Sequence, residues 1–168
     1  MMNKSLILFI ISLFFLGCTN HPPLATVEKV DINRYLGTWY EIARFDHSFE
    51  RGCSHVTATY ALKENGDIKV LNRCIDETGQ EDIAKGSAFS TTPENNKLKV
   101  TFFWPFYGNY WILMLDKKYS YAVVGDPSRN YLWILSRSKS LNKKSLDTII
   151  KKLPSLGFDT SKLIWTKQ

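Results

Sequence analysis

The most reactive side chains of the sequence are three cysteine thiols and three histidine imidazoles. They are Cys18, Cys53, Cys74, His21, His47 and His55. A thiol can act as a nucleophile, take a lipid or form a disulfide. The histidines lack the spacing of metal ligands, and the sequence contains no HExxH, GxSxG or glycine-rich phosphate motif. These residue types therefore predict no metal site, no cofactor and no enzyme of the corresponding classes.

Cys18 follows an N-terminal segment that has the features of an export signal. Lys4 gives a short basic region, Leu6–Leu16 is almost continuously apolar, and Gly17 precedes the thiol. Such a run is too short to span a membrane comfortably. Phe15-Leu16-Gly17-Cys18 resembles a bacterial lipobox, in which the cysteine takes a diacylglycerol and acyl chains such as palmitate. We predict a signal peptide over 1–17 and acylation of Cys18; the alternative is an ordinary secretory signal with an incidental cysteine.

The residues after Cys18 indicate a tether and a location. Thr19 follows the cysteine, where aspartate would favour retention in the inner membrane, so we predict an outer-membrane lipoprotein that faces the periplasm. Residues 18–29 contain the stiff pair Pro22-Pro23 and are predicted to form the tether, with a reach of at most about 40 Å. The net charge is +6, but an exported chain does not meet nucleic acid, so we exclude that partner. A lysine run over 143–152 is either a solvated helix face or a surface for anionic lipids.

Residues 30–168 are predicted to form one all-β domain. Aromatic residues make up 14% of the chain, and few stretches have helical periodicity. Asn65-Gly66 is a strong hairpin signal, because this pair tolerates the positive φ of a tight turn. Eight strands are expected, over residues 37–46, 53–63, 68–74, 82–91, 97–104, 110–115, 119–125 and 131–137. Short connections favour an eight-stranded up-and-down antiparallel β-barrel, since closure removes the exposed edges of an open sheet.

One C-terminal α-helix is expected to pack outside the barrel. Asn142 is the predicted N-cap, and Pro154 should end the helix. Between them lies an apolar stripe at helical spacing, formed by Leu146, Ile149, Ile150 and Leu153. Leu163-Ile164-Trp165 is predicted to be a short final strand.

Three segments at one end of such a barrel resemble the conserved segments of the lipocalins. They contain Gly37-x-Trp39, the turn around Asp116, and Arg137 at the end of the last long strand. The resemblance covers residues 30–168 and is strongest to the bacterial outer-membrane lipocalins, followed by apolipoprotein D. It implies that Arg137 lies across the Trp39 ring in a cation–π contact. The alternative is that Trp39 is an aromatic core residue opening an ordinary strand.

The resemblance also implies that the barrel carries a small hydrophobic ligand, here a fatty acid or a lysophospholipid. An eight-stranded barrel is wide enough to hold one such molecule. Alternate apolar positions on the strands are the candidate ligand contacts, namely Tyr60, Phe102, Tyr110, Ile112, Met114, Tyr121, Val123, Trp133 and Leu135. Each of them could instead belong to the plain core or to the outer face under the helix. Arg51 and Arg129 could hold a headgroup, although surface solvation is the simpler role for both.

Two further features concern the open end of the barrel. The aromatic segment 104–108 is expected to be a loop that touches the membrane, gates the mouth, packs in a homodimer or folds into the mouth. Cys53 and Cys74 are expected to form a disulfide in an oxidising periplasm. The predicted hairpin register places Cys74 opposite Thr57, four residues from Cys53, so the bridge requires a bulge or a bend.

Two other classes of function remain open from the sequence. One is an enzyme that acts on the bound lipid, for which a free thiol in the cavity would be the strongest sign. The other is a structural envelope lipoprotein with a filled barrel. Glu41 shares the parity of Trp39 and is expected to point inward, where it would either polarise a ligand or make a structural hydrogen bond.

Overall fold

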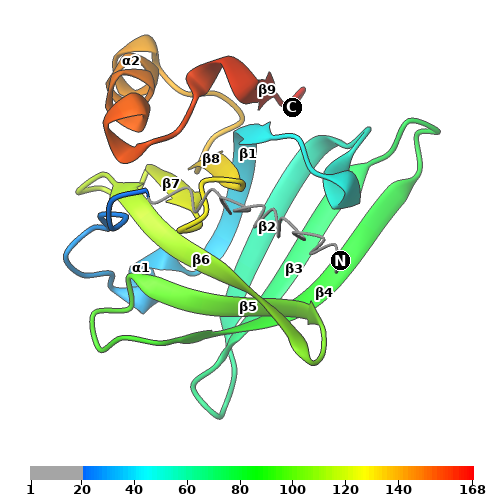
Figure 1. Cartoon of the computed structure of the whole chain (residues 1–168). Helices are drawn as coiled ribbons and strands as arrows, with labels where there is room; N and C mark the ends of the chain where they lie inside the picture. The colour runs from blue at the N-terminus through cyan, green and yellow to red at the C-terminus, as the bar shows by residue number, and fades with distance from the viewer. Residues whose placement is uncertain (1–20) are drawn as a thin grey trace, which may run out of the picture.

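The computed structural model describes residues 21–168, which form a β-barrel with helical segments outside it (Figure 1). The predicted signal peptide and Cys18 lie outside the described residues. The strands are β1 Gly37–Phe45, β2 Ser54–Leu62, β3 Ile68–Ile75, β4 Glu81–Ser90, β5 Lys97–Phe103, β6 Phe106–Leu115, β7 Tyr121–Gly125, β8 Leu132–Ser136 and β9 Leu163–Trp165. The helical segments are α1 Ile32–Tyr35, η1 Ser48–Glu50, α2 Lys143–Lys152, η2 Leu153–Leu156 and η3 Thr160–Lys162.

The sheet closes on itself. Each strand from β2 to β8 pairs with the next, and β1 pairs antiparallel with both β8 and β2. The short strand β9 adds to the end of β1, where Ala43 faces Trp165. The prediction of an eight-stranded up-and-down antiparallel barrel is therefore confirmed, as is the short final strand.

The β5–β6 connection differs from the predicted loop over 104–108. Phe103 pairs with Phe106 and Val100 pairs with Gly108, so β6 begins four residues earlier than the predicted strand at Tyr110. Phe106 and Tyr107 are aromatic residues that favour strands, and they extend the ladder up to a tight turn at Trp104-Pro105. The aromatic segment therefore forms the tip of a hairpin and not a separate loop.

The β2–β3 register also differs from the prediction, by one residue. Thr57 faces Arg73 and not Cys74, because the Lys63 amide donates to the Asp67 carbonyl and so closes the turn one residue earlier than predicted. A register shift between Ser54 and Thr57 then brings Cys53 beside Cys74. The two cysteines form the predicted disulfide, with their Cα atoms 5.5 Å apart, within the usual range. The bulge that the prediction required is present.

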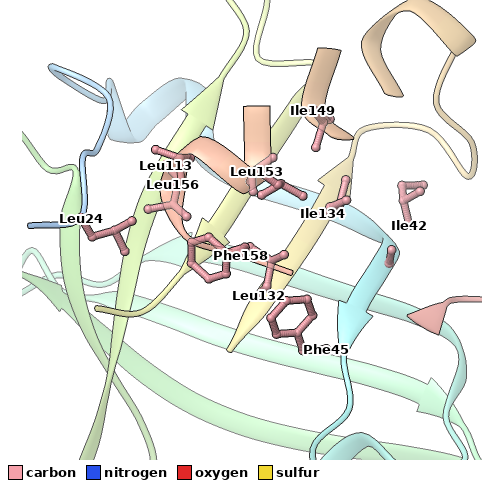
Figure 2. Packing of buried hydrophobic residues seen from close by; sticks show 12 residues of the cluster. Leu24, Ile42, Phe45, Leu113, Leu132, Ile134, Ile149, Leu153, Leu156 and Phe158 are labelled. Carbon is pink, nitrogen blue, oxygen red and sulfur yellow. The ribbon is translucent and has the colours of Figure 1, made fainter. Parts of the chain in front are cut away.

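Two hydrophobic cores lie on either side of the barrel wall. The inner core fills the closed end around Trp39, Ile112 and Leu135. The outer core lies between the wall and α2, and Figure 2 shows Ile149, Leu153 and Phe158 packed over β7 and β8. The helix begins as predicted, since the Asn142 side chain accepts a hydrogen bond from the Ser145 amide. Residues 153–156 then continue as the short 3₁₀ segment η2, which contains Pro154.

Residues 22–30, here named the N-terminal strap, pack on the barrel where a free tether was predicted over 18–29. The Pro22 carbonyl accepts a hydrogen bond from Arg129 Nη2 at 2.6 Å, and Leu24 is buried in the outer core. The Val27 amide donates to the Ile112 carbonyl at 3.0 Å. Val30 is fully buried in the inner core. Apolar side chains at Leu24, Val27 and Val30 explain this packing, because leaving them in water would cost free energy.

Candidate ligand-binding site

A cavity of about 740 Å³ occupies the open half of the barrel. All eight barrel strands except β7 contribute side chains to its wall, and the η1 segment and the β7–β8 turn border its mouth. The volume lies within the range of roughly 300–1,000 Å³ that is usual for small-molecule sites. The barrel is therefore hollow at one end and filled at the other.

The structure brings five of the nine predicted ligand contacts to this cavity. They are Tyr60, Phe102, Tyr110, Trp133 and Leu135. Other wall positions are small or aliphatic, such as Ala84, Val70 and Val100. The wall is thus mainly apolar and aromatic, which suits a hydrocarbon chain.

The other four predicted contacts do not line the cavity. Ile112 is buried in the inner core below it, and Val123 belongs to the outer core, against which Met114 and Tyr121 also pack. For Met114 the cause is a register shift between Ile112 and Met114, which turns the side chain to the outer face. On β7 the side chains that face the barrel interior are Ala122 and Val124, not the predicted Tyr121 and Val123. Both faces of this strand are covered by apolar residues, so the sequence has no polar alternation that would tell them apart.

Three tyrosine hydroxyls meet at the floor of the cavity. Tyr110 lies between the other two, with its hydroxyl oxygen 2.8 Å from that of Tyr35 and 2.9 Å from that of Tyr60. Burial raises the pKa of all three phenols, so they remain protonated at neutral pH. Tyr35 was not among the predicted contacts; it is the last residue of α1, which closes this end of the barrel. The floor can therefore offer hydroxyl groups to a ligand.

A second polar cluster, here named the mouth cluster, consists of Glu41, Arg44, His47, Glu50 and Trp133. Arg44 Nη1 donates to Glu41 Oε1 at 2.9 Å, and Arg44 Nη2 donates to the Glu50 carbonyl at 2.7 Å. Trp133 Nε1 donates to Glu50 Oε2 at 3.1 Å. Glu41 and Glu50 both border the cavity. Glu41 also accepts a hydrogen bond from Thr166. Of the two roles expected for Glu41 from the sequence, the structural hydrogen bond is therefore present.

Burial sets the charges in the mouth cluster. It raises the pKa of Glu50 to about 8, and the neighbouring Glu41 carboxylate adds to the effect. Burial and then the charge of Arg44 lower the pKa of His47 to about 4. His47 Nε2 lies 3.2 Å from Glu50 Oε2, but at neutral pH the imidazole is neutral and Glu50 is mostly protonated. The contact is therefore not an ion pair at neutral pH.

Arg44, His47 and Glu50 were not predicted as site residues. Glu41 and Arg44 lie three apart, which puts them on opposite faces of a regular strand, but β1 has a register shift between Glu41 and Ala43 that brings them together. Glu50 lies on a short 3₁₀ turn in a loop. The periodicity of the sequence cannot predict where a loop residue such as Glu50 points. The only local signal was that this charged residue lies beside Phe49.

The closed end of the barrel holds the predicted motif residues. The Arg137 guanidinium lies 3.8 Å from the centroid of the Trp39 ring, and it donates to the carbonyls of Arg34, Tyr35, Leu36 and Thr38. Asp116 accepts hydrogen bonds from the amides of Lys118, Ser120 and Tyr121 and so shapes the β6–β7 turn. Gly37 has a φ of 89°, which favours glycine.

A comparison with known families agrees with this geometry, since the model of the lipocalin-like domain matches residues 30–168. The chain belongs to the lipocalin family. It is 43% identical over 157 residues to the outer membrane lipoprotein Blc of Escherichia coli K12, covering 90% of this chain and 89% of the relative. The Blc protein of Vibrio cholerae is 43% identical over 169 residues, covering 98% and 99%.

More distant lipocalins share the fold. Bovine apolipoprotein D is 36% identical over 167 residues, covering 92% of this chain and 85% of the relative. The solved structure of insecticyanin from the tobacco hornworm Manduca sexta superposes with a TM-score of 0.72 at 23% identity, covering 88% of this chain and 85% of that one. The family resemblance read from Gly37, Trp39, Asp116 and Arg137 is thus confirmed.

The structure gives the two arginines of this lipocalin different positions. Arg51 is exposed at the mouth and pairs with Asp46 at 2.9 Å. Arg129 is buried and donates to the carbonyls of Pro22, Pro127 and Leu156, so the surface role expected for it was wrong. The guanidinium of Arg129 thus donates its hydrogen bonds to backbone carbonyls, including those of the strap and of η2.

Residues 21–168, the described part of this lipocalin, show neither an arrangement of metal ligands nor a helix that could span a membrane. No cluster of three or more His, Cys, Asp or Glu side chains there is arranged to hold a metal ion. No helix within the same residues is long and apolar enough to cross a membrane.

Proposed function

We propose that this lipocalin carries one single-chain lipid, a fatty acid or a lysophospholipid, in the cell envelope of a bacterium. The observation that carries the proposal is the cavity of about 740 Å³, apolar along its wall and polar at its two ends. Burial of a hydrocarbon chain contributes about 0.8 kcal/mol per CH₂, before the cost of confining the chain is subtracted. Micromolar affinity is therefore attainable without a strong polar contact.

Three observations favour a carrier over the other classes. The open cavity argues against a structural lipoprotein whose barrel is filled with side chains. Cys53 and Cys74 are joined to each other, so neither offers the free thiol that an enzyme acting on the lipid through cysteine would need. Glu41 is engaged by Arg44 and Thr166.

Ligand binding is tested by titrating a fluorescent fatty acid into delipidated full-length protein and displacing it with natural fatty acids and lysophospholipids. Tyr110→Ala, which alters the cavity floor, should weaken binding. Tyr121→Ala is the matched control, because it removes the same side chain from the outer face, where Tyr121 packs against the outer core. Affinity should fall as the acyl chain is shortened. Equal effects of the two substitutions, or no signal at saturating protein, would contradict the carrier proposal.

We further propose that Cys18 is acylated and anchors the domain to the outer membrane on its periplasmic face. The sequence motif supports this, and the relatives from Escherichia coli and Vibrio cholerae are named outer membrane lipoproteins. Cys18→Ala should release the protein into the soluble periplasmic fraction, because acyl chains supply most of the attachment. Unchanged membrane fractionation of this variant would contradict the anchor and would leave the binding test above unaffected.

A further inference from the structure

The N-terminal strap runs along the barrel from its closed end to its mouth. At the closed end, the Val30 amide donates to the Glu94 carbonyl in the β4–β5 turn at 2.8 Å. Near the middle, Val27 bonds to Ile112 of β6. At the other end of the strap, Pro22 is held by Arg129 of the β7–β8 turn, which borders the cavity through Asp126 and Tyr131. In Figure 1 the strap is the blue segment beside β6 and β7.

This path restricts where a lipid on Cys18 can lie. Cys18 is four residues before Pro22, so even a fully extended chain reaches only about 14 Å from the β7–β8 turn. Were residues 18–30 free, twelve residues would reach roughly 43 Å, and either end of the barrel could meet a membrane. The strands β7 and β8, which lead from this turn back to the closed end, are each five residues long, which corresponds to about 17 Å. The packed strap therefore keeps the anchor within about 14 Å of a turn that borders the cavity, which is short of the closed end.

The mouth carries exposed aromatic side chains that suit a bilayer surface. At the β5–β6 tip, Phe103 is 76%, Trp104 77% and Phe106 71% exposed. Tryptophan favours the headgroup layer, where its ring meets both apolar and polar surroundings. At the closed end, Leu62 is 52% exposed, but it adjoins the polar turn 63–67. The aromatic tip and the anchor thus lie at the same end.

Charge does not explain an attraction of this end to a membrane. The β3–β4 turn and the first residues of β4, also at the open end, carry the carboxylates of Asp76, Glu77, Glu81 and Asp82. These groups would be repelled by anionic lipids, so contact must come from the aromatic tip. The surface expected to bind is therefore that of a zwitterionic bilayer, and the contact should depend little on salt.

We infer that the strap turns the open end of the barrel toward the bilayer, with the β5–β6 tip resting in the headgroup layer. The inference rests on the proposed acylation of Cys18. In this orientation the cavity opens onto the membrane, and a single-chain lipid passes between bilayer and barrel with little exposure to water.

The test uses the full-length acylated protein in phosphatidylcholine vesicles that contain a lipid with a spin label near the headgroup. The spin label quenches nearby tryptophan fluorescence, and the difference between wild type and Trp104→Phe isolates the contribution of Trp104. A variant with both Trp104→Phe and Leu62→Trp reports on the closed end. Both altered side chains are largely exposed, so the fold should tolerate the changes.

We expect strong quenching of Trp104 that persists at about 1 M salt, where screening acts beyond about 3 Å. The tryptophan placed at position 62 should be quenched far less. Greater quenching at position 62, equal quenching at both positions, or none at either would overturn the inference. Loss of quenching at high salt would point to the lysines of α2 and would also overturn it. Failure of the protein to float with vesicles would reject the anchor, whereas the lipid titration would still report on ligand binding.

Discussion

Glu50 should make the stability of the folded protein fall as the pH rises from 7 to 8.5. Its pKa is about 8 in the folded state, against roughly 4.3 in an unfolded chain. Within this window the folded state holds a proton on Glu50 that the unfolded state has lost. Because the folded state binds more protons, the free energy of unfolding decreases as pH increases.

The magnitude follows from the two pKa values. A change of one pH unit corresponds to at most about 1.4 kcal/mol for one proton. Integrated from pH 7 to 8.5 with a folded pKa of about 8, the loss is about 1.2 kcal/mol. His47 has a pKa of about 4 in the folded state, against roughly 6.5 in an unfolded chain. Its contribution therefore makes the free energy of unfolding increase with pH between about pH 4 and 6.5, and it changes little at higher pH. The window therefore isolates the carboxyl pair of Glu50 and Glu41.

The assay is urea denaturation of wild type and Glu50→Gln at several pH values between 7 and 8.5. The amide keeps the shape of the side chain and can still accept the hydrogen bond from Trp133, but it does not titrate. Glu50→Gln should therefore lose the slope. Asp46→Asn is the control, since Asp46 is an exposed carboxylate whose pKa is lowered by its hydrogen bond with Arg51. If Glu50→Gln keeps the wild-type slope, Glu50 is ionised at neutral pH and our account of the mouth cluster is wrong.

Two further predictions concern the closed end and the disulfide. Trp39→Ala should destabilise the protein by about 3–5 kcal/mol as a large truncation in the core, and Arg137→Ala by less. Their coupling in a double-mutant cycle of urea denaturation should be about 0.5–2 kcal/mol, and a coupling near zero would refute the pairing. Replacing both Cys53 and Cys74 with Ser should cost about 3 kcal/mol, because the bridge spans 21 residues of chain. Reduced wild type should then match the double variant in thermal denaturation, and a difference would show that the serines act locally.

The sequence predicted the features that depend on regular alternation or on a local signal. The strand positions, the Asn142 cap and the closed barrel follow from periodicity and turn residues. The contact of Arg137 with Trp39 rested on the family resemblance. The prediction of which β7 side chains face the cavity was wrong, since Tyr121 and Val123 face the outer core. Both faces of this strand are apolar. A strand covered on both sides carries no alternation to read.

Other features of the site could not be predicted because they depend on irregular backbone. The register shift after Ile112 moved Met114 outward, and the one in β1 joined Glu41 to Arg44. Glu50 reaches the cavity from a loop, where no period applies. The packing of the strap depends on partners that are remote in sequence, such as Arg129 for Pro22.

The meeting of the strap with the C-terminal segment also has a consequence for the order of folding. Leu24 is among the first residues of the described chain to be synthesised, yet its neighbours in the outer core include Leu156 and Phe158, more than 130 residues later. Contacts between such distant residues form slowly, because a long loop must be closed and its closure costs conformational entropy. A nascent barrel can pair its strands in sequence as they emerge, but its outer core waits for the last turns of the chain. Truncation at either terminus should therefore damage one and the same late-forming cluster.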